Sequence, residues 1–226
     1  MLPKFELDLS SVVISIVCTK GITFEEDDDT ENELETDVPF EQLQKGEEHV
    51  NPRKFDKLDE LIKPIAEQLY EQQSDFPLTV IYVENLESLW YYFRYLEYEL
   101  KEKGYNGENI TENRMFAQYH SDYPETMKQH IVKDLCQSKP ILRLVLATVA
   151  LGLGLNAPSI RRIILCRPPT TLQKYMQEIG RVGRNGENAE AVMYFNNSDL
   201  SKARAGLTSS VIEYCKNELF ASGNYW

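Results

Sequence analysis

Residues 142–186 read LRLVLATVALGLGLNAPSIRRIILCRPPTTLQKYMQEIGRVGRNG, and this stretch decides the fold. Two runs in it, Leu142–Ala147 and Ile160–Cys166, have the length and the apolar character of strands that are buried on both faces. Pro168 and Pro169 end the second run, because proline cannot donate to a strand ladder. The stretch therefore predicts two buried strands of a parallel sheet.

A helix is expected after the second of these strands. Thr170 or Thr171 can cap it through a side-chain oxygen, and Leu172–Ile179 form its body. The other expected strands are Leu78–Val83, Met115–Tyr119 and Ala191–Phe195, and the other expected helices cover residues 55–69, Leu86–Lys103, residues 122–135 and Val211–Phe220. Strands alternating with helices predict an α/β fold, a parallel sheet flanked by helices, in which ligands bind at the carboxyl ends of the strands.

Three local features add to this outline. We expect Pro64 to kink or restart the first helix and Asp122 to cap the third. Val12–Cys18 is typical of a strand, but the sequence shows no partner for it. Residues 25–37, EEDDDTENELETD, are acidic and nearly free of large apolar groups, so we expect a disordered acidic segment there.

The segment Gln177–Gly186, QEIGRVGRNG, places Arg181 and Arg184 three residues apart between glycines. Arginine stays charged at any useful pH and offers a planar fork of donors that fits phosphate oxygens. Glycine lets the backbone approach a ligand closely. The alternative is a surface turn with two solvated arginines. The offsets of Gln177 and Gly186 favour a segment that reaches a triphosphate held by another domain.

Residues 147–156, ATVALGLGLN, run from a strand into a loop that contains glycine. Thr148 lies where a hydroxyl and the following backbone N–H groups can hold a phosphate. Gly152 and Gly154 permit a close approach, and Asn156 can hydrogen-bond a hydroxyl or an amide. A tight turn with glycines for packing is the alternative, and a GxG pattern alone does not decide between the two.

Two aromatic groups have both a nucleic-acid and a core interpretation. Tyr119 can stack on a base and His120 can contact a backbone phosphate, or both can lie at the edge of the core. Six aromatic residues crowd the helix that begins at Leu86, namely Trp90, Tyr91, Tyr92, Phe93, Tyr95 and Tyr98. Their spacing favours burial over a base-stacking surface.

The charge of the chain is unevenly distributed. The net charge is -12, but residues 21–50 hold twelve acidic side chains against one lysine, a net of -11, so the other 196 residues together carry only -1. Residues 139–184 carry eight lysine and arginine side chains and a single acid, Glu178. A local basic strip that faces phosphate is therefore expected beside an acidic segment.

Cysteine usage and hydropathy indicate a soluble, intracellular protein with no membrane partner. Cys18, Cys136, Cys166 and Cys215 are widely separated, which excludes a disulfide framework and a zinc site complete within this chain. Buried free thiols in a reducing compartment are expected. The apolar run Val12–Cys18 is too short to span a bilayer and lacks the flanks of a secretory signal.

Together, these segments resemble a known family. Residues 147–165, ATVALGLGLNAPSIRRIIL, and residues 177–186 closely resemble the last two motifs of RecQ-type DNA helicases of superfamily 2. Residues 79–89, TVIYVENLESL, resemble the strand that opens the family's second RecA-like lobe, and residues 116–129, FAQYHSDYPETMKQ, resemble its Tyr-His segment. The resemblance predicts a helicase C-terminal lobe over residues 52–206.

The resemblance also divides the remaining chain. It leaves an N-terminal strand and acidic segment over residues 1–51. Residues 207–226 resemble the start of the family's zinc-binding subdomain, with YCKN at Tyr214–Asn217. Cys215 is the one matching zinc cysteine, so zinc is expected in a full-length protein only.

The resemblance implies three catalytic roles. Arg184 is the arginine finger, Arg181 lies on the phosphates or in a structural ion pair, and Gln177 orients the motif. Family members translocate 3′ to 5′ on single-stranded DNA while ATP opens and closes two lobes. The resemblance further implies a nuclear location and roles in DNA repair and recombination.

The binding roles that the resemblance implies lie at the predicted strand ends. Gly154 and Asn156 lie near the nucleotide, and Thr148 and His120 lie near the DNA backbone, beside Tyr119. ATP and Mg²⁺ are shared with a first RecA-like lobe, and single-stranded or forked DNA is the expected partner.

The sequence departs from the family pattern in one important respect. It holds no GxxxxGK[ST] phosphate loop and no Asp-Glu box after an apolar strand. We therefore expect a fragment or truncated product that does not hydrolyse ATP alone. Two alternatives stay open: a non-catalytic module that binds DNA or a partner, and a lobe of a DEAD-box RNA helicase, in which His-Arg is usual at Gln177-Glu178.

Overall fold

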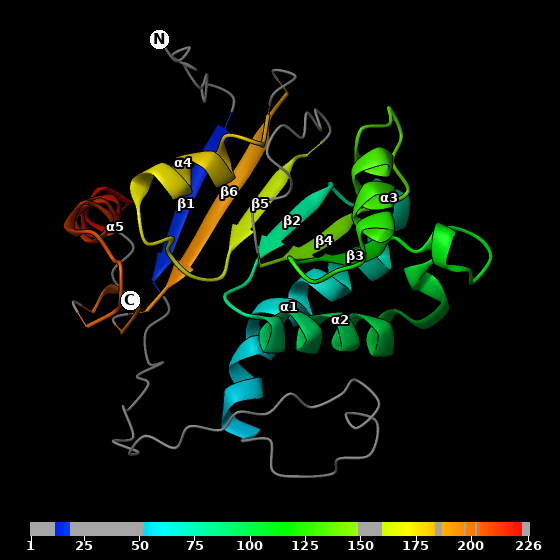
Figure 1. Ribbon diagram of the computed structural model, residues 1–226, viewed down its shortest axis with the longest axis horizontal. Helices are drawn as coiled ribbons and strands as arrows, with labels where there is room; N and C mark the ends of the chain where they lie inside the picture. The colour runs from blue at the N-terminus through cyan, green and yellow to red at the C-terminus, as the bar shows by residue number, and fades with distance from the viewer. Residues whose placement is uncertain are drawn as a thin grey trace.

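The computed structural model describes residues 12–18, 52–148, 160–183, 187–196, 198–201 and 203–222 (Figure 1). Six parallel strands form one sheet in the order β1-β6-β5-β2-β4-β3. The strands are β1 Val12–Cys18, β2 Thr79–Tyr82, β3 Phe116–Tyr119, β4 Leu144–Ala147, β5 Arg162–Leu165 and β6 Ala189–Phe195. This sheet confirms the predicted α/β fold and all five strands expected from Leu78 onward.

Helices cover both faces of the sheet. They are α1 Pro52–Gln72, α2 Leu86–Leu100, α3 Glu125–Leu135, α4 Leu172–Ile179 and α5 Ser209–Ser222, with short 3₁₀ turns at Gln73–Asp75, Lys101–Gly104, Thr111–Asn113 and Ser198–Leu200. Helices α1 and α2 lie together on one side, and α3, α4 and α5 lie on the other (Figure 1). Among the helices that the structure describes, none has the length and apolar character needed to cross a bilayer.

Alternation along the central strands builds two cores, one on each face of the sheet. In β2, Val80 and Tyr82 pack with Ile131 of α3 and Ile179 of α4. Ile81, between them, faces the opposite core, which includes Leu69 of α1 and Leu96 of α2. Because side chains alternate with period two, a continuous apolar run can supply both cores, which is why these strands carry no polar face.

The helix caps test two predictions. Thr171 caps α4, since its Oγ1 accepts a hydrogen bond from the N–H of Lys174 at 3.2 Å, as the sequence suggested. The predicted cap at Asp122 is wrong: α3 begins at Glu125 after Pro124, with no side-chain cap. Proline has a fixed φ that suits the position before a first helical turn, so Pro124 sets the start instead.

Helix α1 runs without interruption through Pro64, so the expected restart is wrong, and the expected kink stays a prediction. Proline removes one backbone hydrogen bond and crowds the preceding turn. Four residues around it, Ile62, Ile65, Ala66 and Leu69, are buried in the core that α1 shares with α2. Burial of this apolar face stabilises the helix by more than the proline costs.

Strand β1 has a partner that the sequence did not reveal. It pairs in parallel with β6 along its whole length, from Val12 opposite Ala189 to Cys18 opposite Phe195. Ile16 faces the core and is buried, whereas Val13 is exposed. The strand at Val12–Cys18 is therefore confirmed, and the structure supplies the partner that the sequence did not show. Residues 25–37 lie outside the described part of the chain.

Candidate functional site

Two of the predicted DNA contacts meet where β3 and β4 end. The N–H of Thr148, the residue after β4, donates to the carbonyl oxygen of Tyr119 at 3.3 Å. Thr148 is half-buried at this edge. The Tyr119 side chain is buried in the core with Tyr82 and Ile131, so its burial favours the core interpretation over base stacking.

His120 lies one residue beyond β3 and is half-buried. Its ring centre is 5.2 Å from that of Tyr123. Burial lowers the pKa of His120, an effect that Asp122 opposes and Lys128 reinforces. His120 is therefore neutral at pH 7, and its Nδ1 is buried without a hydrogen-bond partner in the described structure. A neutral imidazole can exchange a hydrogen bond with a ligand but brings no charge to it.

Arg181 is buried behind the end of α4, beside Glu178. Burial raises the pKa of Glu178 to about 7, and the positive charges of Lys174 and Arg181 oppose that rise. An arginine with 7% of its surface exposed has little freedom to reach a ligand. Of the two roles that the resemblance allowed for Arg181, its burial favours the structural one over contact with the phosphates.

Of the remaining predicted site residues, one is exposed and three lie outside the described residues. Gln177 is exposed on α4. Gly183 has φ of +69°, a left-handed conformation that favours glycine, and its N–H donates to the carbonyl of Ile160 at 3.4 Å. Arg184, Gly154 and Asn156 lie outside the described residues, so their roles stay predictions.

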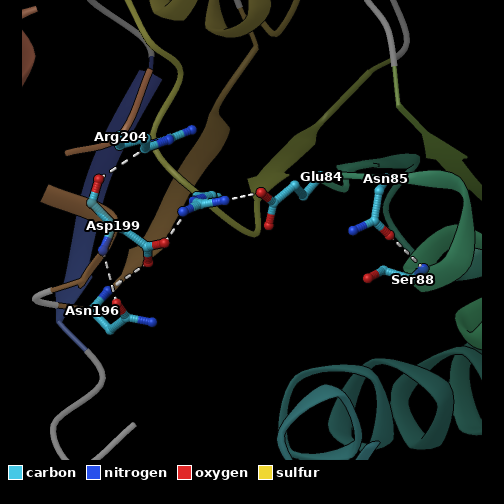
Figure 2. A network of polar contacts seen from close by, with 7 residues as sticks. Glu84, Asn85, Ser88, Asn196, Asp199 and Arg204 are labelled. Carbon is cyan, nitrogen blue, oxygen red and sulfur yellow. Dashed lines mark hydrogen bonds and ion pairs between the residues drawn. The ribbon is translucent and has the colours of Figure 1, made fainter. Parts of the chain in front are cut away.

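A polar network at the carboxyl edge escaped the sequence analysis. Arg167, which follows β5, forms ion pairs with Glu84 after β2 and with Asp199 after β6. Asp199 Oδ2 accepts the N–H of Asn196 at 2.8 Å, and the Asp199 N–H donates to Asn196 Oδ1 at 2.9 Å (Figure 2). Arg204 Nη1 donates to the Asp199 carbonyl at 3.3 Å. One guanidinium thus links the ends of three strands.

A signal for this network existed in the sequence. Glu84 and Arg167 each come shortly after a predicted apolar strand, and carboxyl ends of parallel strands share one edge. Asn85, next to Glu84, caps α2 by accepting the N–H of Ser88 at 2.9 Å (Figure 2). The strand order, which places β5 between β2 and β6, was needed to bring the charges together.

The expected basic strip does not form one surface. Arg143, Arg161 and Arg162 lie at the amino ends of β4 and β5, whereas Arg167 lies past the carboxyl end of β5. Three of these arginines are also paired with acids: Arg162 with Glu190 at 3.1 Å, Arg161 with Glu187, and Arg167 with Glu84 and Asp199. The strand direction therefore separates charges that are close in sequence.

Cysteines and metal ligands give no cluster in the described ranges. No group of three His, Cys, Asp or Glu side chains could hold a metal ion there. Cys215 is fully buried in the core, and burial raises its thiol pKa to about 12. Cys166 is half-buried, and burial raises the pKa of its thiol to about 12. Cys136 is exposed, so the expectation of buried thiols is wrong for this residue.

Comparison with protein families assigns this chain to a family. The model described as helicase conserved C-terminal domain matches residues 53–186, which include β2 to β5 and the segment after α4. The chain belongs to this helicase family. The matched residues include the Thr148–Tyr119 hydrogen bond and the buried side chains of Arg181 and Glu178.

Relatives agree with this assignment. The helicase lobe is 34% identical over 87 residues to ATP-dependent DNA helicase Q-like 5 of Arabidopsis thaliana, covering 38% of this chain and 9% of that protein. It is 38% identical over 93 residues to ATP-dependent DNA helicase Q-like SIM of the same plant, covering 41% of this chain and 10% of that protein. The chain spans about a tenth of the length of these relatives.

A solved structure supports the fold alone. Mss116p bound to single-stranded RNA and AMP-PNP superposes with a TM-score of 0.51 at 17% identity, covering 75% of this chain and 28% of that one. By its family match the chain carries a helicase C-terminal domain, and this domain is RecQ-like by sequence similarity.

Proposed function

We propose that this chain is the second motor lobe of an ATP-dependent 3′–5′ DNA helicase. The observation that carries the proposal is the match to the helicase C-terminal domain over residues 53–186, together with similarity to RecQ-like DNA helicases. ATP and Mg²⁺ would bind between this lobe and a first RecA-like lobe. The bound metal and the arginine would neutralise charge on the transferring phosphoryl group.

Arg184 is the proposed arginine finger, and Arg181 is a positioning residue. The burial of Arg181 supports this division, because a buried guanidinium anchors the segment rather than reaching out of it. Gly183, with its left-handed backbone, separates the two arginines and turns the chain between them. Gln177 would orient the segment, and Gly154 and Asn156 would lie near the nucleotide.

The DNA contacts are proposed for the edge where β3 and β4 end. The Thr148 hydroxyl and the His120 imidazole both belong to residues that directly follow strands, and the backbone hydrogen bond from Thr148 to Tyr119 holds the two strand ends together. Hydroxyl and neutral imidazole groups can hydrogen-bond the phosphates of single-stranded DNA. Tyr119 would support this edge from within the core.

The test joins the 226-residue chain to a cognate first lobe and measures ATP hydrolysis with and without single-stranded DNA. Arg184→Ala should lower DNA-stimulated turnover by about 10³-fold or more while ATP and DNA binding persist. Arg94→Ala, at an exposed position of α2, is the matched control and should leave turnover unchanged. Equal turnover in Arg184→Ala and the parent would remove the finger assignment. Absence of DNA-stimulated hydrolysis in the parent pair would favour a non-catalytic binding module.

A further inference from the structure

A cavity lies near the amino ends of the strands, opposite the carboxyl ends where the DNA contacts are proposed. Its volume is about 350 Å³. It is formed by the turn before β2, the turn before β4 and the residue before β5, and its lining consists of Ser74, Asp75, Phe76, Pro77, Leu78, Ser138, Lys139, Pro140, Arg143 and Arg161. It therefore contains three members of the basic strip, Lys139, Arg143 and Arg161, to which the proposed helicase function assigns no role.

The charges that line this cavity are mainly positive. Lys139, Arg143 and Arg161 line it together with a single carboxylate, Asp75. Glu187 pairs with Arg161, so that charge is partly neutralised from outside the cavity. Lys139 and Arg143 form no ion pair with any residue in the described ranges. Two of its cations thus have no ion-pair partner among the described residues, and the hydroxyls of Ser74 and Ser138 are further donors.

Arg143 has an unmet hydrogen-bonding requirement. Its Nε is buried and has no hydrogen-bond partner among the described residues. A buried donor on a charged group costs more than a neutral one when it is left without an acceptor, so such groups call for a ligand, an ion or a water molecule. The rest of the Arg143 side chain is half-buried and lines the cavity, where an anion would supply the missing negative charge.

The backbone holds these cations in place. The N–H of Arg143 donates to Met115 O at 2.7 Å, and its carbonyl accepts from Thr79 N at 2.8 Å. The N–H of Arg161 donates to Leu78 O at 2.9 Å. The backbone of both arginines is thus anchored beside β2 and β3, and Pro77 and Pro140 stiffen the two turns. A site with a fixed backbone loses less entropy when it binds.

We propose that this cavity binds a compact phosphate-bearing anion of about the size of a di- or triphosphate. The fork of Arg143 suits two phosphate oxygens, and Lys139 adds a point charge at the rim. A volume of about 350 Å³ is near the lower limit for ligand sites, which suits a small anion better than a folded partner. Asp75 disfavours a long polyanion that would have to pass the rim.

The experiment is calorimetric titration of the 226-residue chain with tripolyphosphate at constant ionic strength. Arg143→Gln should raise the dissociation constant by about tenfold or more, because the charge-assisted hydrogen bonds from the guanidinium to the phosphate oxygens are lost. Lys139→Gln should raise the dissociation constant severalfold. Lys133→Gln, an exposed lysine on α3 outside the cavity, is the matched control and should bind as the parent does.

A further variant and a competition measurement distinguish the possible outcomes. Arg143→Lys keeps the charge but loses the fork, so intermediate affinity supports the proposal even where Arg143→Gln does not fold. Unchanged affinity in both Arg143→Lys and Lys139→Gln, or no binding of tripolyphosphate to the parent, overturns it. Single-stranded DNA is added as a competitor: retained tripolyphosphate affinity supports a small-anion site, and displacement assigns the cavity to a nucleic-acid backbone instead.

Discussion

Arg167 and Asp199 form an ion pair that ties the end of β5 to the turn after β6, with Arg167 Nε 2.6 Å from Asp199 Oδ1. Asp199 is buried, and its carboxylate also accepts a backbone hydrogen bond from Asn196. Glu84 approaches the same guanidinium from the end of β2. One arginine therefore couples three strand ends at the edge where helicase ligands are proposed to bind.

Loss of this arginine should be costly. Arg167→Gln leaves the Asp199 carboxylate buried without its counter-charge, so the free energy of unfolding should fall by about 3 kcal/mol. Arg94→Gln, which removes an exposed ion pair with Glu97, should cost less than about 0.5 kcal/mol. Urea denaturation of both variants measures the difference. A loss for Arg167→Gln as small as that for Arg94→Gln would contradict the structural role of the network.

The Glu178 carboxyl makes stability depend on pH. Its folded pKa of about 7 lies above the ordinary value of 4.5, because burial outweighs Lys174 and Arg181. The folded chain therefore binds more protons than the unfolded chain between these values, and stability falls as pH rises from about 4.5 to 7. Glu178→Gln removes this dependence.

The difference between Glu178→Gln and the parent should thus grow with pH. Between pH 5 and pH 8 the variant should gain on the order of 1–3 kcal/mol relative to the parent. Denaturant titrations at both pH values measure it. A difference that stays constant across this range would show that Glu178 is already ionised at pH 5 in the folded chain.

Strand β1 should be an integral part of the fold. Ile16 is buried in the core, so Ile16→Ala should lower the free energy of unfolding by about 2–4 kcal/mol. Val13, on the same strand, is 63% exposed, and Val13→Ala should change it by less than about 0.5 kcal/mol. Equal effects of the two substitutions would show that the pairing with β6 contributes little to stability.

His120 should contact DNA as a neutral group. His120→Ala should weaken binding of single-stranded DNA by about threefold to tenfold at pH 7.5, the loss expected for one hydrogen bond. Since burial lowers the pKa of His120 from its ordinary value of 6.5, its positive charge should add affinity only below that pH, and the variant should lack that gain. Fluorescence anisotropy measures both. His130→Ala, an exposed histidine on α3, is the control, and an equal loss there would contradict the assignment.

Local sequence signals predicted the elements that depend on near neighbours. The bounds of α4, Leu172–Ile179, were predictable, and because a cap acts over three residues the sequence limited the cap to Thr170 or Thr171. The central strands were predictable because burial on both faces requires a continuous apolar run. The cap of α3 was not, since Pro124 set the helix start in competition with Asp122.

The succession of strands and helices along the chain, the parallel sheet and the resemblance to RecQ-type helicases could all be read from the sequence. The tertiary structure was needed to show that β1 pairs with β6, that Arg181 is buried, and that the basic strip is divided between the two ends of the strands. The order of strands within the sheet and the burial of side chains depend on contacts between residues far apart in the chain, which local sequence patterns do not contain. Residues 143 and 167 are close in sequence, but each strand carries the chain from one edge of the sheet to the other, so they serve different sites.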